Sequence, residues 1–206
     1  MMMTNSQEAL ARTLLQIGAI RFGAFRLKLH DFQPDAPLSP IYLDLRLLRS
    51  FPTAMKIAVE VYSEVTALLK FDCYADVPTA ATPLVGALAF ANQVPMISPR
   101  LEKKAHGTGT AVDGYARPEC IAVLIDDLIT RADSKLQAIE VLEGHGVRVR
   151  DVVVLVDREQ GGMAELERRG YEGHAALRLS AMLDYYYKEH SISTEDYERT
   201  VQYLRG

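Results

Sequence analysis

One stretch, from Cys120 to Asp133, limits the fold of this chain more than any other, because an apolar run ends in it on two adjacent carboxylates, Asp126 and Asp127. The run before the acids is short and β-branched, which favours a strand, whereas residues 134–142 carry apolar side chains at helical spacing. The acids therefore stand where a strand gives way to a helix. In an open α/β sheet this edge binds ligands, and a helix N-terminus adds N–H groups that suit a phosphate. The alternative is an ordinary turn with an N-cap aspartate.

The rest of the chain alternates short apolar runs with helical patterns. Strands are predicted near residues 73–77, 94–98, 121–125, 152–156 and 175–179, and helices at 52–68, from 82 onwards, and at 134–143, 163–169, 181–190 and 194–204. Such alternation is typical of an α/β fold with a mostly parallel sheet flanked by helices.

The first 50 residues follow a different pattern. Asn5 and Glu8 have the spacing of a capping box for a first helix, which Gly18 ends. A segment at 20–29, a proline-rich loop at 30–40 and an alternating run at 41–46 come next. No linker divides the chain after them, so we expect a single domain.

Composition excludes several classes of protein. With 206 residues, 49% of them apolar, the chain can bury a sizeable core, and its formal charge of −4 gives no electrostatic argument for binding nucleic acid. Cys73 and Cys120 lie in apolar runs, which favours buried thiols in a reducing compartment over a disulfide. No stretch is long enough to span a membrane, and residues 1–6 lack the pattern of a secretory signal. We therefore expect a cytoplasmic protein.

The segment from Pro99 to Pro118 has neither helical nor strand periodicity. It brings Arg100, Lys103, Lys104 and His106 close to several glycines. Cations on a movable loop that faces paired acids suit a phosphorylated substrate, so we interpret the segment as a lid, with a solvated surface loop as the alternative.

Taken together, six segments resemble the type I phosphoribosyltransferases, and within them the orotate phosphoribosyltransferases. The segments are IGAIRFGAFRLKLH at 17–30, SPIYLDLR at 39–46, DVPTAATPL at 76–84, PRLEKKAHGTG at 99–109, VLIDDLIT at 123–130 and VLVDREQGG at 154–162. The resemblance implies a parallel sheet flanked by helices, with a small N-terminal hood of about residues 1–50 over a core of about 51–206. It also implies the transfer of a phosphoribosyl group from phosphoribosyl pyrophosphate (PRPP) to orotate, a step of pyrimidine synthesis.

The resemblance assigns roles to individual residues. Asp126 and Asp127 would meet the ribose hydroxyls of PRPP, because two fixed acceptors can hold vicinal donors. Pro78, Thr79 and Ala80 fall at the pyrophosphate loop. The 5′-phosphate would be wrapped by the backbone and hydroxyls of Thr130, Arg131, Ala132, Asp133 and Ser134.

The orotate ring and the lid are assigned in the same way. Lys28, Thr130 and Arg158 would contact orotate, with the planar guanidinium of Arg158 bonding its carboxylate bidentately. Arg100, Lys103, Lys104 and His106 would close over the active site of a neighbouring subunit and neutralise the departing pyrophosphate, which implies a homodimer. Lys104, His106 and Asp127 are the expected catalytic residues. Mg²⁺ would be held mainly by the phosphates of the substrate, and no protein ligand for it is assigned.

Four residues depart from the family pattern. Leu101 stands where the family has a lysine, Ala132 where it has a glycine, and Asp133 brings a carboxylate next to the expected phosphate. The fourth departure is Asp76, which stands before the pyrophosphate loop where a glycine is common in the family. Two alternatives therefore stay open: a transferase for another nucleobase, and a sensor of PRPP or nucleotide with little turnover. Arg158 could also form a surface ion pair with a neighbouring acid. A separate orotidine-monophosphate decarboxylase is a possible partner.

Overall fold

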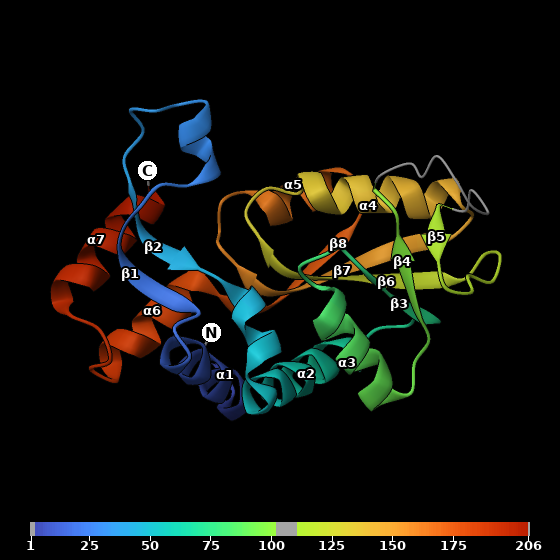
Figure 1. The fold of residues 1–206 in the computed structure, drawn as a ribbon, viewed down its shortest axis with the longest axis horizontal. Helices are drawn as coiled ribbons and strands as arrows, with labels where there is room; N and C mark the ends of the chain where they lie inside the picture. Colours follow the sequence, from blue (N-terminus) through green and yellow to red (C-terminus); the bar gives the residue numbers. More distant parts are fainter. Residues whose placement is uncertain (1–2, 102–110, 206) are drawn as a thin grey trace.

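A parallel sheet forms the centre of the computed structural model, which describes residues 3–101 and 111–205 (Figure 1). The strand order is β5-β4-β3-β6-β7-β8, and only β5 runs antiparallel to its neighbour. This confirms the predicted α/β sheet. The strands are β3 (Cys73–Asp76), β4 (Met96–Pro99), β5 (Val112–Asp113), β6 (Ile121–Ile129), β7 (Arg148–Asp157) and β8 (Glu172–Arg178).

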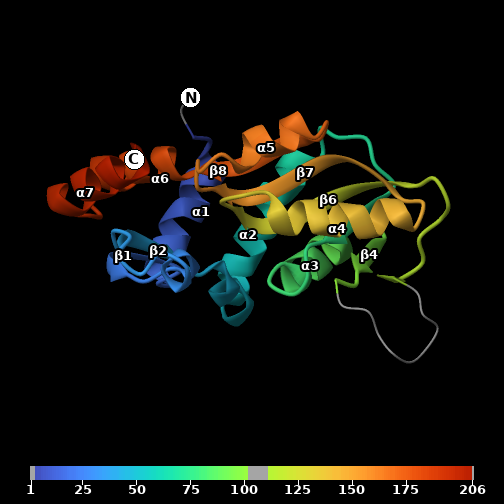
Figure 2. The ribbon, with the colours of Figure 1, turned by 90° about the horizontal axis from the view of Figure 1, so that it is seen from above.

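Helices cover both faces of the sheet, as Figures 1 and 2 show. On one face lie α2 (Pro52–Thr66) and α3 (Thr82–Asn92), and on the other lie α4 (Asp133–Gly144) and α5 (Gly162–Arg168). Alternation along β7 explains the two layers, because Val153 packs in the cluster under α2 whereas Val152 packs in the cluster under α4. Both faces of the central strands are therefore buried.

The chain begins with α1 (Asn5–Gln16) and ends with α6 (Leu179–Lys188) and α7 (Thr194–Arg205). The predicted capping box is present one residue earlier than expected. Thr4 is the N-cap, its hydroxyl accepts from the backbone N–H of Gln7, and the side chain of Gln7 accepts from the backbone N–H of Thr4 at 2.8 Å. Asn5 is therefore the first residue of the helix and not its cap.

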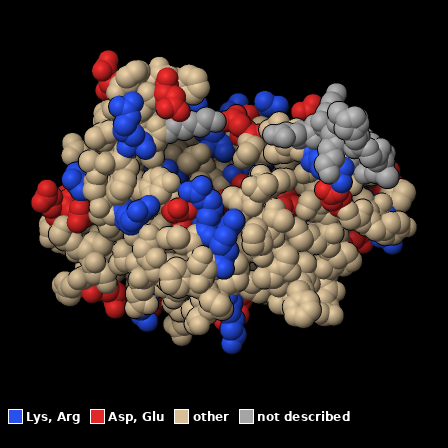
Figure 3. All heavy atoms as spheres, in the orientation of Figure 1, with Lys and Arg blue, Asp and Glu red and all other residues tan. Residues whose placement is uncertain are grey.

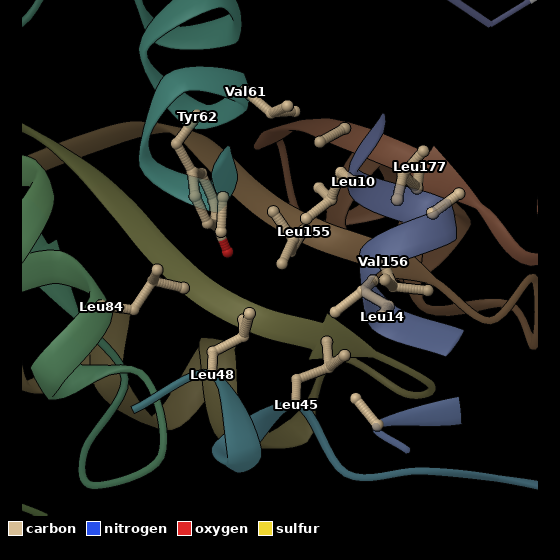
Figure 4. Packing of buried hydrophobic residues seen from close by; sticks show 14 of the residues in the cluster. Leu10, Leu14, Leu45, Leu48, Val61, Tyr62, Leu84, Leu155, Val156 and Leu177 are labelled. Atoms are coloured by element: carbon tan, nitrogen blue, oxygen red, sulfur yellow. The ribbon is translucent and has the colours of Figure 1, made fainter. Parts of the chain in front are cut away.

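The hood is a two-stranded antiparallel sheet of β1 (Ile20–Phe25) and β2 (Ser39–Leu43), flanked by the 3₁₀ helices η1 (Lys28–Asp31) and η2 (Leu45–Ser50). The C-terminal helix α7 lies beside β2 in Figure 1. One hydrophobic cluster runs from the hood into the core, and Figure 4 shows Leu48 on the side of Leu84 and Tyr62 and Leu45 pointing towards Leu14. The hood therefore shares the core of the main sheet.

Two expectations about the elements were wrong. Strand β6 does not end at Ile125 but continues through both acids to Ile129, because β7 remains paired with it as far as Asp157. The segment 99–118 is not without strands, since β5 pairs with β4. Residues 102–110, which include Lys103, Lys104 and His106 of the predicted lid, lie outside the described residues.

The cysteines follow the prediction from composition. Cys73 and Cys120 are both free and buried, and burial raises the pKa of Cys73 to about 12. Among the described residues, no helix has both the length and the apolar character needed to cross a membrane.

Candidate active site

Three loops meet at the carboxyl edge of the sheet, and each holds residues predicted for the site. They follow β3, β6 and β7, which are parallel neighbours. The backbone N–H of Arg158 donates to the carbonyl of Ile129 at 3.0 Å, and that of Val77 donates to Ile125 at 3.1 Å. Thr79, Ala80, Thr130 and Arg158 are therefore brought to one edge, as the parallel topology requires.

The two adjacent acids point to opposite faces of the sheet, because side chains alternate along a strand. Asp126 faces α4, where its carboxylate is 6% exposed and lies 2.5 Å from the Nζ of Lys135. Asp127 faces the side of the hood and is half-buried. Asp126 is therefore paired with Lys135, whereas Asp127 lies on the side of the hood, where its Oδ1 accepts from the backbone N–H of Leu128 at 2.8 Å. That both carboxylates meet the ribose hydroxyls stays a prediction.

Asp127 shares a surface hollow with two arginines that sequence reasoning did not select. Arg46 and Arg49 project from η2, and Ala80 of the predicted pyrophosphate loop completes the rim. Arg49 Nη2 donates to the carbonyl of Ala80 at 3.2 Å, which links the hood to that loop. Figure 3 shows the surface recessed between hood and core, with basic and acidic side chains around it. Cations and one carboxylate thus face the same opening.

A three-residue period was the signal that could have found these arginines. Leu45 and Leu48 are buried, whereas Arg46 and Arg49 are exposed. Residues three apart share one side of a 3₁₀ helix, so one side of η2 anchors it in the core while the other presents two cations.

The loop between β6 and α4 does not need the glycine that the family usually has. Ala132 has a φ of −87°, which any residue adopts, and its side chain is buried. Helix α4 begins at Asp133, and Arg131, Asp133 and Ser134 are exposed around its N-terminus. The predicted phosphate loop therefore keeps the N-terminus of a 12-residue helix, with an acid as the first helical residue.

Asp76 has a structural explanation. Its side chain is fully buried at the end of β3, and one carboxylate oxygen accepts from the hydroxyl of Thr82, the first residue of α3. The acid therefore joins the two ends of the loop that carries Thr79 and Ala80.

Arg158 is the most unusual side chain at this edge. It is 7% exposed, and its Nε and Nη2 are buried without a hydrogen-bond partner among the described residues. Burial lowers the pKa of its guanidinium. The alternative of a surface ion pair is wrong, because Asp157 Oδ1 accepts from the backbone N–H of Glu159, whose carboxylate accepts from Ser180.

Two positions after Arg158 need glycine, the first because of its backbone conformation and the second because of close packing. Gly161 has a φ of +89°, which L side chains rarely adopt. A Cβ at Gly162 would lie 2.5 Å from a side-chain carbon of Ile129 and 2.9 Å from the carbonyl oxygen of Thr130. This close approach packs the loop of Arg158 directly against the predicted phosphate loop.

The remaining predicted residues are placed only in part. Arg100 follows β4, and its Nε donates to Asp113 of β5 at 2.8 Å. Leu101 packs against the hydrophobic cluster under α4, which explains an apolar residue there. Lys103, Lys104 and His106 lie outside the described residues; the backbone of Lys28 begins η1, but its side chain is also outside them.

Potential metal ligands gather elsewhere. Within residues 3–101 and 111–205, the group of three that lie close enough to share an ion is Asp151, Glu172 and His174, near the starts of β7 and β8. That is the edge of the sheet opposite the loops described above. Magnesium held mainly by the phosphates of the substrate stays a prediction.

Comparison with known proteins decides the family. No protein-family model matches the chain. It is 35% identical to the orotate phosphoribosyltransferase of Methanopyrus kandleri over 181 residues, which cover 88% of this chain and 91% of that protein. This chain belongs to the orotate phosphoribosyltransferase family.

Larger proteins also contain this family's domain. The chain is 33% identical to the uridine 5′-monophosphate synthase of Bos taurus over 199 residues, 96% of this chain but 40% of that protein. The solved structure of the UMP synthase of Leishmania donovani superposes with a TM-score of 0.84 at 33% identity, over 96% of this chain and 42% of that one. The chain thus spans about two fifths of the length of these two relatives.

Proposed function

We propose that this protein transfers the 5-phosphoribosyl group of PRPP to orotate, giving orotidine 5′-monophosphate and pyrophosphate. The observation that carries the proposal is Arg158, whose buried guanidinium has two nitrogens without a partner in the described part of the chain. A buried cation of this kind is costly unless an anion completes it, and the carboxylate of orotate accepts two parallel N–H bonds from a guanidinium. The neutral rings of uracil and hypoxanthine lack that carboxylate.

In the proposed reaction the bond from ribose C1 to pyrophosphate breaks, a bond from C1 to the ring nitrogen of orotate forms, and the proton on that nitrogen passes to the departing pyrophosphate or to water. Asp127 accepts hydrogen bonds from the ribose hydroxyls, and the N-terminus of α4 receives the 5′-phosphate. Thr79 and Ala80 receive the pyrophosphate, next to Arg46 and Arg49. Mg²⁺, when bound with PRPP, would neutralise charge on the phosphates. The residues of the chain thus bind, orient and stabilise charge, with no covalent intermediate.

We also propose that the protein acts as a homodimer. Helix α3 carries no charged residue along its length, and Phe90 on its outer side is 80% exposed. The surface over α3 is correspondingly free of charged side chains in Figure 3. A helix that is apolar on all sides is normally buried, so a second copy of this chain is the proposed cover. A dimer would also allow Arg100, Lys103, Lys104 and His106 to reach the neighbouring site.

The proposed setting is the cytoplasm, since two free buried cysteines suit a reducing compartment. A decarboxylase that acts on orotidine 5′-monophosphate is the proposed partner activity.

The test is the loss of orotate in the presence of PRPP and Mg²⁺, with uracil and hypoxanthine as control bases and with chelator added in a parallel series. We expect turnover of orotate only, which chelator abolishes. Turnover of uracil or hypoxanthine without turnover of orotate would show that the protein is a transferase for that base. If calorimetry shows binding of PRPP but no base is turned over, the protein is a sensor of PRPP and not an enzyme.

A further inference from the structure

Lys135 is a lysine in a position where the fold calls for an apolar residue. It lies on α4 in the buried stripe that continues with Ala138 and Leu142, and its side chain is 5% exposed. A lysine is rarely buried to this extent unless it is paired. The sequence contains this signal, because 135, 138 and 142 are spaced as one side of a helix.

The ammonium group of Lys135 contacts both neighbours of Asp127. Its Nζ lies 2.5 Å from Asp126 Oδ2 and donates to the carbonyl of Leu128 at 2.6 Å. The other carboxylate oxygen, Asp126 Oδ1, accepts from the backbone N–H of Asp127 at 2.9 Å. The backbone of Asp127 is therefore fixed on one side by the carboxylate of Asp126 and on the other by the contact to Leu128.

A second contact holds the same part of β6 from the opposite face. The hydroxyl of Tyr62 on α2 donates to the backbone carbonyl of Asp126 at 2.5 Å, and Tyr62 is fully buried. Figure 4 shows its hydroxyl directed towards β6. With Tyr62 on one face and Lys135 on the other, the strand has little freedom to shift at Asp126.

The surroundings make the interaction between the two charges strong. Ile129 and Ala132, which begin and end the loop between β6 and α4, are both buried. Burial raises the pKa of Asp126, and the charge of Lys135 opposes that shift. In a poorly hydrated environment such a pair keeps its geometry, and the loss of one partner leaves the other uncompensated.

We propose that Lys135 is a positioning residue of the active site, which joins α4 to β6 across the loop 130–132 and thereby fixes Asp127 and that loop for PRPP. This inference rests on the proposed function, because the proposed function is what places PRPP at Asp127 and the loop 130–132. Lys135 touches no substrate in this arrangement and acts through Asp126 and Leu128.

The test compares Lys135→Met with Lys56→Met, which removes an exposed lysine of α2 whose side chain is 77% exposed. The Kd for PRPP is measured by calorimetry, and KM and kcat are measured with orotate. We expect Lys135→Met to raise the Kd and KM for PRPP at least tenfold while the KM for orotate changes less than threefold. Lys56→Met should stay within twofold of the unaltered protein in every value.

A merely structural role would give a different result. Lys135→Met would then unfold at a lower temperature but bind PRPP with an unchanged Kd, and this outcome would overturn the proposal. If Lys135→Met does not fold, the double variant Asp126→Asn, Lys135→Met removes both buried charges together. Its Kd for PRPP should then be raised at least tenfold, and an unchanged Kd would overturn the proposal. Failure of the unaltered protein to turn over orotate would sink the proposed function separately, since the Kd comparison does not depend on turnover.

Discussion

At the scale of single residues, the site contains two buried cations in opposite situations. Lys135 is paired with Asp126 and hydrogen-bonded to Leu128, whereas two nitrogens of Arg158 have no partner within residues 3–101 and 111–205. A paired buried charge is part of the folded framework, and an unpaired one is a cost that a ligand can remove. The contrast agrees with the two proposed roles, in which Lys135 positions the site and Arg158 binds the substrate.

Replacing Arg158 should therefore improve stability while it impairs function. Arg158→Met removes a buried guanidinium whose unsatisfied nitrogens cost about 1–3 kcal/mol, so the melting temperature should rise by roughly 2–12 °C. Losing two charge-assisted hydrogen bonds to orotate, at about 1.5 kcal/mol each, should lower kcat/KM for orotate about 100-fold. Thermal unfolding and steady-state kinetics check both expectations.

The matched control is Arg150→Met, which removes an exposed arginine of β7, the strand that Arg158 follows. It should leave kinetics unchanged. A less stable Arg158→Met with an unchanged KM for orotate would show that Arg158 belongs to the framework.

Asp127 should matter for turnover and little for folding. Its side chain is half-buried at the rim of the hollow, so Asp127→Asn keeps the shape and removes only the charge. We expect kcat/KM for PRPP to fall at least about 100-fold, as the loss of charged hydrogen bonds to two hydroxyls implies, with the melting temperature within about 2 °C.

Asp133→Asn should have the opposite effect on the kinetics with PRPP. This exposed acid begins α4, where it repels a phosphate, so its neutralisation should lower the KM for PRPP several-fold. Equal effects of the two substitutions would contradict the separate roles given to Asp127 and Asp133.

At the scale of elements, the predictions from sequence succeeded where periodicity and punctuation agreed. Pro52 begins α2, and Gly146 and Gly170, both at positive φ, follow α4 and α5 as turns that glycine tolerates. The end of β6 was missed because carboxylates are normally read as the end of a buried strand, and only pairing with β7 extends it to Ile129. Strand β5 is two residues long, too short for any period to show.

The loop after β7 depends on a glycine for its contact with the loop after β6. Gly162→Ala would place a Cβ 2.9 Å from the Thr130 carbonyl oxygen, and a backbone atom cannot move aside without displacing the phosphate loop. We expect a loss of about 1–3 kcal/mol in stability, as for other overpacked sites, together with a higher KM for PRPP. Denaturant unfolding and kinetics measure the two effects.

Gly144→Ala is the control, because a Cβ there meets nothing within 4 Å. It should leave KM unchanged and raise stability by up to about 1 kcal/mol through helix propensity. If Gly162→Ala behaved like Gly144→Ala, the close packing of the two loops would have no role in binding.

At the scale of the whole molecule, the candidate site lies between the hood and the sheet, and this explains which parts of it could be predicted. Arg158 and Asp127 follow or occupy strands, so the order of elements alone brings them together. Arg49 reaches Ala80 only because η2 packs in the common core, and Lys135 reaches Asp126 only because α4 packs on β6. Such contacts depend on tertiary packing, which no local pattern contains.

The proposed dimer interface is the apolar surface of α3. Phe90 is 80% exposed on α3, a helix without charges, and we propose that it packs against a second copy. Placing a glutamate at each of two symmetric positions removes two buried phenyl groups, at about 2 kcal/mol each, so Phe90→Glu should weaken the dimer at least about 1,000-fold. Light scattering after gel filtration should show a dimer for the unaltered protein and a monomer for the variant.

Activity should fall with the dimer, because in the proposed dimer the predicted lid residues of one chain would act in the site of the other. Phe90→Leu keeps the helix face apolar and should remain dimeric and active, which separates the effect of charge from that of losing the ring. A monomeric Phe90→Glu with full activity would show that each chain completes its own site. A dimeric Phe90→Glu would exclude α3 as the interface, since two carboxylates cannot be buried there unpaired without a large cost in free energy.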